Sequence, residues 1–357
     1  MDAMRRCYRH PLIDGADIYS CTIRQGNMGS LMSANLATWL RQNSCPPLLL
    51  WNRTASKLPA ESDAIKHAKS AKELAEKCEI IFTSMANDEA ARAVYADLFE
   101  GVKNKAQGAK TYFIETSTLF PTTAGELERQ ASKLPGTSYL QAPVFGPPPM
   151  AKEAKLVWVL SGDVSARKAV QPFLVPSMGR KVLDVGSNVE RASAFKLNGN
   201  MMVLGIIELL AEGLTLAEKT GVGAELLMEF VKEFMPAPSA IGYGTRITEN
   251  NFVGETGFTV DGGLKDARHL RQLAQSVDAT IPVIDLAHQH LVTSRAHGGK
   301  DRDWSSLVAG IRLASGLMPF TGQKQIPHDT GFGAKTEDDD PTNEPVRDGG
   351  IKTVQNF

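Results

Sequence analysis

Short apolar runs alternate with amphipathic segments from Met28 to about Asp184. This alternation is typical of parallel βαβ units, in which helices connect buried strands. Strands are predicted at Ile18–Ile23, Leu48–Trp51, Ile80–Thr83, Tyr112–Glu115, Tyr139–Ala142, Val157–Ser161 and Lys181–Val185. Between the first two, apolar residues recur at helical spacing from Met28 to Leu40. We therefore predict a doubly wound α/β domain over residues 1–186, with an atypical first strand.

The pattern changes after Gly186. Ala192–Thr220 is a proline-free helical stretch, and no alternating strands follow it, so residues 187–316 are predicted to form an all-helical domain. Apolar residues surround most of this stretch, which predicts a buried helix that is both the spine of the domain and a dimer surface. From Leu317 apolar residues become scarce and Gly, Pro, Asp and Asn prevail, as in a disordered tail (317–357).

Composition narrows the class of partner. The 357 residues include 39 basic and 40 acidic side chains, so no basic excess points to a nucleic-acid or polybasic membrane binder. The longest apolar runs are shorter than the roughly 20 residues of a membrane span, and none is predicted. The 4 cysteines match neither zinc ligands nor a small disulfide framework, which favours reduced thiols in an intracellular protein. Small-molecule partners are expected.

The N-terminal segment bears on location. Arg5, Arg6 and Arg9 are followed by no apolar run before Asp14 and Asp17, so a secretory signal does not fit. A mitochondrial presequence is an alternative, against which the acidic residues weigh. We therefore predict a cytoplasmic protein.

A candidate dinucleotide-binding turn precedes the first predicted helix. Gly26 and Gly29, with Asn27 and Met28 between them, match the second and third glycines of G-x-G-x-x-G, where the backbone passes close to a pyrophosphate. Arg24 replaces the first glycine, at a position that requires a tight turn. Two alternatives remain open: a plain loop, or a first segment that derives from a wrongly joined exon.

Two further strand ends are candidates for cofactor binding. Asn52, Arg53 and Thr54 follow Leu48–Trp51, where a Rossmann domain meets the adenosine ribose. A cation and hydrogen-bond donors suit a 2′-phosphate, so NADPH is preferred over NADH, the alternative being a solvated turn.

Met85 and Asn87 follow Ile80–Thr83, at the crevice of an open parallel sheet, and are predicted to touch the cofactor. Alternatively, Asn87 or Asp88 only caps the next helix.

Five motifs in order resemble one enzyme family. The segment Gly26–Leu36 resembles the N-terminal signature of the β-hydroxyacid dehydrogenases, which include 3-hydroxyisobutyrate dehydrogenase and glyoxylate/succinic semialdehyde reductases and share the 6-phosphogluconate dehydrogenase NADP-binding domain. Glu115–Pro121, Ala142–Val144, Lys196–Asn200 and Lys265–Asp266 resemble four further family segments. The resemblance implies a Rossmann domain, a long interdomain helix, a helical C-terminal domain, and NAD(P)-dependent interconversion of a short hydroxy acid and its carbonyl form.

The resemblance implies that Lys196 is the catalytic acid/base and that Asn200 orients it or the substrate. The residues themselves lie four apart on one helical face, and a protonated amine there would stabilise the alkoxide formed by hydride transfer. The alternative is a surface lysine whose charged end reaches solvent.

Three more residues are predicted near the nicotinamide. Ser117 and Thr118 would hydrogen-bond there, although such a pair is commonly a helix cap. Lys265 is predicted to contact cofactor or substrate, because a cation at the start of the helix Leu264–Ala274 would oppose the helix dipole if it were a mere surface residue. His269, four residues later, is more often a bystander. No metal is expected, since the cofactor supplies the hydride chemistry.

The substrate loop departs from the family pattern. The family continues Ala-Pro-Val with Ser-Gly-Gly, whereas this chain continues with Phe145, Gly146 and three prolines. Phe145 donates no hydrogen bond and the prolines lack N–H groups, which favours a bulkier or less acidic carbonyl substrate. Lys196 favours carbonyl over imine chemistry. A homo-oligomer, dimer or tetramer, is expected; the alternative to an enzyme is a catalytically impaired dinucleotide-binding or scaffold protein.

Overall fold

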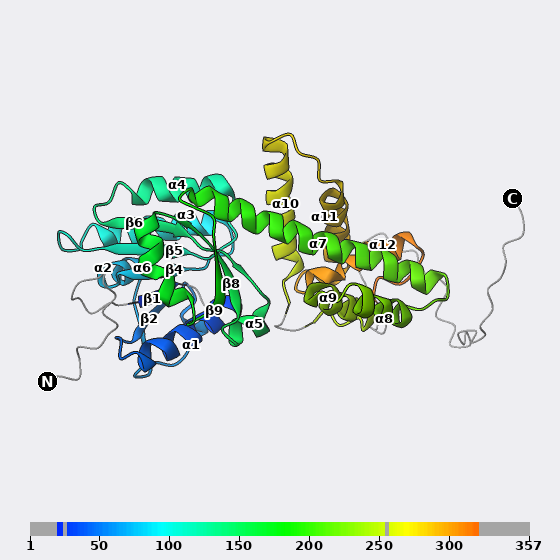
Figure 1. Ribbon diagram of the computed structural model, residues 1–357, viewed down its shortest axis with the longest axis horizontal. Helices are drawn as coiled ribbons and strands as arrows, with labels where there is room; N and C mark the ends of the chain where they lie inside the picture. Colours follow the sequence, from blue (N-terminus) through cyan, green and yellow to red (C-terminus); the bar gives the residue numbers. More distant parts are fainter. Residues whose placement is uncertain (1–19, 24–26, 254–256, 321–357) are drawn as a thin grey trace, which may run out of the picture. The chain divides into compact units, whose positions relative to one another are not determined.

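The computed structural model describes residues 20–23, 27–253 and 257–320, which form two compact units (Figure 1). The first unit holds the described residues up to Met201, residue 257 and Arg268–Thr280. The second holds 202–253, Phe258–Ala267 and 281–320. Arg24 and Gly26 of the predicted dinucleotide-binding turn lie outside the described part of the chain. Residues 321–357 of the predicted tail also lie outside it.

The first unit is built on a nine-stranded sheet of order β3-β2-β1-β4-β5-β6-β8-β7, with β9 paired to β8. Strands β1 to β6 are parallel, whereas β8 runs antiparallel to β6 and β7. The strands are β1 (Ser20–Ile23), β2 (Leu48–Trp51), β3 (Ile65–His67), β4 (Ile80–Thr83), β5 (Thr111–Glu115), β6 (Thr137–Gln141), β7 (Val144–Phe145), β8 (Leu156–Gly162) and β9 (Gly179–Asp184). The predicted doubly wound, Rossmann-type class is confirmed, and each predicted strand is present over its described residues, with small shifts at the ends of several later strands; Ile18 and Tyr19 of the first lie outside the described residues.

Two strands, β3 and β7, were not predicted. Strand β3 covers only Ile65–His67 and pairs with β2 alone, at the edge of the sheet. Strand β7 has two residues, which pair with Trp158 and Val157 of β8. Segments this short show no measurable alternation of apolar and polar residues, so pairing with a neighbour, and not local pattern, defines them.

Helices cover both faces of the sheet. They are α1 (Asn27–Gln42), α2 (Ala71–Lys77), α3 (Asp88–Val102), α4 (Pro121–Ala131), α5 (Pro148–Lys152) and α6 (Val164–Leu174), followed by the first part of α7 (Val189–Lys219). One core cluster includes Leu36 of α1 and Phe173 of α6, and another includes Leu74 of α2 and Leu98 of α3. All residues of β4 and β5 are buried, as expected for central strands of a covered parallel sheet.

Helix α7 has 31 residues, and the division between the two units falls inside it, between Met201 and Met202. Leu204, Ile207 and Leu214 on one face are buried, as predicted. The expectation that the whole helix is buried is wrong: Met202, Leu209 and Leu216 are 67%, 59% and 64% exposed. These three residues are seven positions apart, which places them on one face of the helix; we call them the α7 stripe.

By length and composition, α7 meets the criterion for a membrane-crossing helix, with a mean hydropathy of 1.5 over the best window. The core helix of a soluble protein meets the same criterion, so the expectation of no membrane span stays a prediction. Half of that window is buried inside the protein, as in the core helix of a soluble domain.

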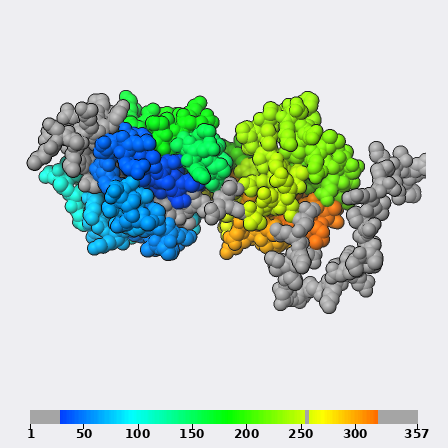
Figure 2. Space-filling model, turned by 90° about the horizontal axis from the view of Figure 1, so that it is seen from below, coloured from blue at the N-terminus to red at the C-terminus, as the bar shows by residue number. Residues whose placement is uncertain are grey.

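In the second unit, the regular secondary structure of the described residues is helical apart from one isolated bridge between Thr259 and Asp303, so the predicted all-helical character is confirmed there. Its elements are the remainder of α7, α8 (Ala224–Phe234), α9 (Pro238–Thr248), part of α10 (Val260–Ser276), α11 (Pro282–Ser294), two short turns (Arg295–Gly299 and Trp304–Leu307) and α12 (Val308–Ala314). Leu210, Leu214, Met228 and Val231 form a core between α7 and α8. Helix α8 lies at the surface, in the yellow-green part of Figure 2.

Candidate functional site

The order of the strands creates a topological switch beside β1, because β2 pairs on one side of it and β4 on the other. In open parallel sheets, ligands bind outside the carboxyl ends of the strands at such a point. Helix α1 begins at Asn27, shortly after β1, and has no acidic residue in its first turn. The backbone N–H groups of a first helical turn have no intrahelical partner, so this end of α1 fits the pyrophosphate of a dinucleotide. Met28 is half-buried and Gly29 buried within this turn.

The end of β2 carries the three residues predicted at the ribose. Asn52 is buried and its side-chain amide donates to Thr54 O (2.7 Å), so that amide shapes its own turn. Arg53 and Thr54 are exposed, and Arg53 makes no ion pair with any described residue. The guanidinium is therefore the group at this strand end that is best placed to meet a phosphate.

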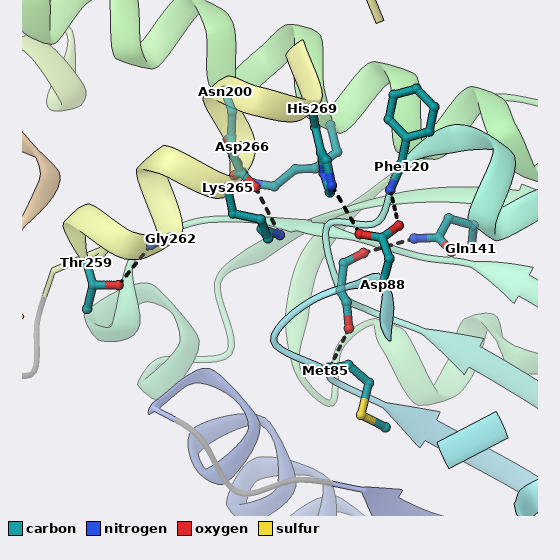
Figure 3. A network of polar contacts seen from close by, with 12 residues as sticks. Met85, Asp88, Phe120, Gln141, Asn200, Thr259, Gly262, Lys265, Asp266 and His269 are labelled. Carbon is teal, nitrogen blue, oxygen red and sulfur yellow. Dashed lines mark hydrogen bonds and ion pairs between the residues drawn. The ribbon is translucent and has the colours of Figure 1, made fainter. Parts of the chain in front are cut away.

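The ends of β4 and β5 are joined by hydrogen bonds that the sequence did not reveal. The Ser117 hydroxyl accepts the Met85 N–H, and the Gln141 amide donates to Ser117 O at 2.9 Å (Figure 3). Ser117 is buried, whereas Thr118 is half-buried. Neither caps the next helix, because α4 has Phe120 at its N-cap and no side-chain cap bond. Ser117 thus fixes the two loops that border the crevice.

Asn87 caps α3. Its side-chain oxygen accepts the Ala90 N–H at 2.9 Å, and the side chain is exposed. Of the two interpretations left open by the sequence, capping is the one that the structure shows.

A buried carboxyl lies under this end of the sheet. Glu115 Oε1 accepts the Ser117 N–H (2.6 Å) and Oε2 accepts the Thr83 hydroxyl (2.7 Å). The Tyr95 hydroxyl lies 2.8 Å from Thr83 Oγ1. Burial raises the pKa of Glu115 to about 7, against the opposing effect of its hydrogen bonds. We call Glu115, Thr83, Tyr95 and Ser117 the interior cluster.

An ionic contact holds residues 268–276 of α10 at the same end of the sheet. Asp88 Oδ2 lies 3.1 Å from His269 Nε2, and Asp88 Oδ1 accepts the Phe120 N–H at 2.9 Å (Figure 3). The Phe120 and His269 rings pack at 5.7 Å between centroids. Burial alone would raise the pKa of Asp88, but hydrogen bonds from His269, Thr123 and the Phe120 N–H hold it well below its ordinary value. His269, regarded from sequence as a bystander, therefore fixes the part of α10 that belongs to the first unit.

Lys196 and Asn200 lie together on α7, as predicted. Lys196 Nζ donates to Asn200 Oδ1 at 2.9 Å, and Nζ lies 4.2 Å from the centroid of the Phe145 ring. Lys196 is half-buried and Asn200 is buried. An ammonium held between an amide oxygen and a ring face is in place to give a proton to a nearby oxygen.

Lys265 lies on α10 in the second unit, where its Nζ is 3.0 Å from Asp266 Oδ1. The helix begins at Val260, and the Thr259 hydroxyl accepts the Gly262 N–H at 3.2 Å (Figure 3). The expectation that Lys265 stands at the start of a helix is therefore wrong, and the argument from the helix dipole does not apply. Gly262 and Gly263 hid the earlier start of the helix from the sequence pattern, and a Cβ atom at either position would crowd the side chain of Phe258 or Trp304.

Comparison with known families accounts for both units. A family model described as the NAD binding domain of 6-phosphogluconate dehydrogenase matches residues 21–186. A second, described as NAD-binding of NADP-dependent 3-hydroxyisobutyrate dehydrogenase, matches residues 191–311. The chain belongs to the β-hydroxyacid dehydrogenase family.

Relatives and solved structures agree with this membership. This chain is 27% identical to the NADH-dependent oxidoreductase ucdB of Aspergillus ustus, over 82% of this chain and 99% of that protein. It is 28% identical to glyoxylate/succinic semialdehyde reductase 2 of Arabidopsis thaliana, over 81% and 78% of the two chains. A structure of Mycobacterium tuberculosis 3-hydroxyisobutyrate dehydrogenase with L-serine shares the fold, with a TM-score of 0.68, 24% identity, and coverage of 83% and 100%.

The dehydrogenase is thus an NAD(P)-dependent oxidoreductase that acts on hydroxyl and carbonyl groups and takes a nicotinamide dinucleotide as cofactor. The residues at the switch point fit that cofactor: the first turn of α1 carries no negative charge, and an exposed arginine follows β2. The assignment of individual residues to cofactor and substrate stays a prediction.

Proposed function

We propose that the protein interconverts a small carbonyl compound and the corresponding alcohol or hydroxy acid, with NADPH preferred as the reductant and Lys196 as the acid/base. The observation that carries this proposal is the 2.9 Å hydrogen bond from Lys196 Nζ to Asn200 Oδ1 on α7. It holds a proton donor at a defined place on a half-buried face of the first unit, which a surface lysine pointing into solvent would not require.

When bound, the nicotinamide supplies a hydride to the carbonyl carbon in one direction and accepts it in the other. In the reductive direction the carbonyl oxygen gains negative charge and takes a proton from Lys196 Nζ, which then regains one from water. In the oxidative direction neutral Lys196 removes the proton of the alcohol. Asn200 keeps the amine in place through its side-chain oxygen.

NADPH is proposed over NADH because of the chemistry at the end of β2. Arg53 is exposed and makes no ion pair with a described residue, and no carboxylate follows β2 directly to bind a ribose 2′-hydroxyl. A guanidinium suits a 2′-phosphate through paired, charge-assisted hydrogen bonds. The name of the Aspergillus relative specifies NADH, so both nucleotides belong in the test.

A homo-oligomer is proposed from the surface of the second unit. The α7 stripe exposes three large apolar side chains, and α8 adds Phe230 and Phe234, which are 50% and 74% exposed and stack at 4.8 Å. Contiguous exposed apolar side chains mark interaction sites, and a second copy of the chain offers a matching apolar face. Light scattering after size-exclusion chromatography should give a dimer or larger assembly, and Leu209→Glu should dissociate it; a monomeric wild type would contradict the proposal.

The central experiment combines binding and turnover. Fluorescence titration with NADPH and NADH is followed by NADPH oxidation with a panel of aldehydes, for wild type and Lys196→Met. We expect tighter NADPH binding, measurable turnover by the wild type, and loss of turnover with intact binding in the variant. Binding without turnover of any aldehyde would instead favour a dinucleotide-binding scaffold, and a fully active Lys196→Met would remove the lysine from the mechanism.

A further inference from the structure

The residue next to the proposed acid/base is aromatic. Phe145 belongs to β7, where it pairs with Val157 of β8, and its ring faces Lys196 Nζ at 4.2 Å from the centroid. The ring also packs on the backbone of α7 at Gly199, where a Cβ atom would overlap it. Phe145 is therefore seated between a strand pairing and a helix backbone, and it stays beside the lysine.

The loop after Phe145 provides few groups that could hold an anion. Pro147 is the N-cap of α5, and Pro148 and Pro149 occupy the first positions of that short helix, so three successive residues lack an N–H group. The Ala151 N–H, further along the same helix, is already used, because it donates to Pro147 O at 3.2 Å. A carboxylate is normally held by several N–H donors in addition to one cation, and this loop does not offer them.

The ring face itself discriminates between charges. The face of an aromatic ring carries partial negative charge, so it attracts the Lys196 ammonium and repels a carboxylate oxygen. The ammonium does attract a carboxylate, but Asn200 Oδ1 at 2.9 Å and the ring already take up two of its sides. A neutral carbonyl needs only one donor, and the apolar ring can pack against its substituent.

We propose that Phe145 determines the substrate class, so that the site takes neutral aldehydes and ketones with apolar substituents in preference to substrates that carry a carboxylate. The inference rests on the proposed role of Lys196, since the ring acts on substrates through the space beside that amine. It assigns to one residue the selection between charged and uncharged carbonyl compounds.

The test uses two substrates that differ only in charge: succinic semialdehyde and its methyl ester, methyl 4-oxobutanoate. We expect the wild type to show a kcat/KM for the ester at least about tenfold above that for the acid, since unpaired charge is strongly disfavoured in such a site. Equal efficiencies, or a preference for the acid, would overturn the inference while leaving the proposed function intact. Turnover of neither substrate by a sample that binds NADPH would overturn both.

Two substitutions separate the ring face from its bulk. Phe145→Ser offers a hydroxyl donor and space, and should shift the ester-to-acid ratio toward the acid by about tenfold. Phe145→Leu keeps an apolar wall but removes the ring face, so it should shift the ratio toward the acid by an intermediate amount, about threefold. Both remove the ring face that stabilises protonated Lys196, so the basic limb of the kcat profile should move to lower pH in both.

Phe195→Leu is the matched control. Its ring meets Phe145 edge-on at 6.3 Å between centroids and is 42% exposed, and no cation–π contact joins it to Lys196. This control should leave the substrate ratio and the pH profile unchanged, and thermal melts verify that all variants fold. An unchanged ratio in Phe145→Ser, or the same shift in Phe195→Leu, would overturn the assignment to Phe145.

Discussion

The interior cluster and the Lys196 site differ in what surrounds their polar groups. In the interior cluster, the Thr83 hydroxyl and the Ser117 N–H both donate to the Glu115 carboxylate inside a covered sheet. At the Lys196 site, a half-buried amine lies between an amide oxygen and a ring face. In the first arrangement the polar groups hold loops in place, whereas in the second we propose that the amine transfers a proton to the substrate. Burial and mutual hydrogen bonding therefore indicate a structural role more than a catalytic one.

The largest effect is expected for Lys196→Met, which should lower kcat by about a thousandfold, in the middle of the range for loss of a general acid or base. The NADPH affinity should stay within about threefold of wild type. Steady-state NADPH oxidation and fluorescence titration measure the two quantities. As a control, Lys152→Met changes an exposed lysine on α5 and should leave both quantities unchanged. Comparable losses of kcat in the two variants would show that the effect is not specific to the Lys196 site.

Glu115→Gln tests the interior cluster through the pH dependence of stability. The folded-state pKa of about 7 lies above the ordinary value of 4.5 that the unfolded chain has, so the native state keeps the proton that the unfolded state releases. The free energy of unfolding should therefore fall as pH rises from about 4.5 to 7, by about 3 kcal/mol in total, and level off above that. Urea unfolding at intervals of pH should show this slope in the wild type and a flatter curve in the variant. An equally steep curve in the variant would contradict the assignment.

Asp88→Asn tests the ionic contact to His269. Hydrogen bonds hold the pKa of Asp88 below its unfolded value of 3.8, so its stabilisation is present above that pH and is lost as pH falls through the folded-state value. We expect the variant to be less stable than wild type by about 2 kcal/mol at pH 7, with a smaller difference at pH 3. Urea unfolding at the two pH values measures both. A difference that grew on acidification would have the wrong sign.

The smallest effect is expected for Arg53→Asp, which should change the ratio of NADPH to NADH affinity by about tenfold in favour of NADH, since one charge-assisted contact is lost. Arg180→Asp, which changes an exposed arginine on β9, is the control for net charge. Paired titrations give the ratio. Equal shifts in the two variants would show that Arg53 acts only through the overall charge.

Sequence patterns predicted the helices and strands better than the side-chain contacts between them. Strands of four or more residues and the long helix were found because apolar periodicity is local, and the motif around Lys196 predicted its pairing with Asn200 because the two share one helix. The contact between Asp88 and His269 joins residues far apart in the sequence, and neither residue carries a local sign of the other. The exposure of the α7 stripe was also missed, since composition records that Met202 or Leu209 is apolar but not which neighbour covers it.

Gly199 and Phe145 fit one another so closely that position 199 cannot gain a side chain while the Phe145 ring is in place. Any side chain at position 199 would occupy the volume of the ring, so a substitution there requires a smaller residue at position 145. Within the family, the two positions should covary: a larger residue on the helix should accompany a small residue in the loop. Along this lineage, the loss of Phe145 would then have to precede the gain of a side chain at position 199 of α7.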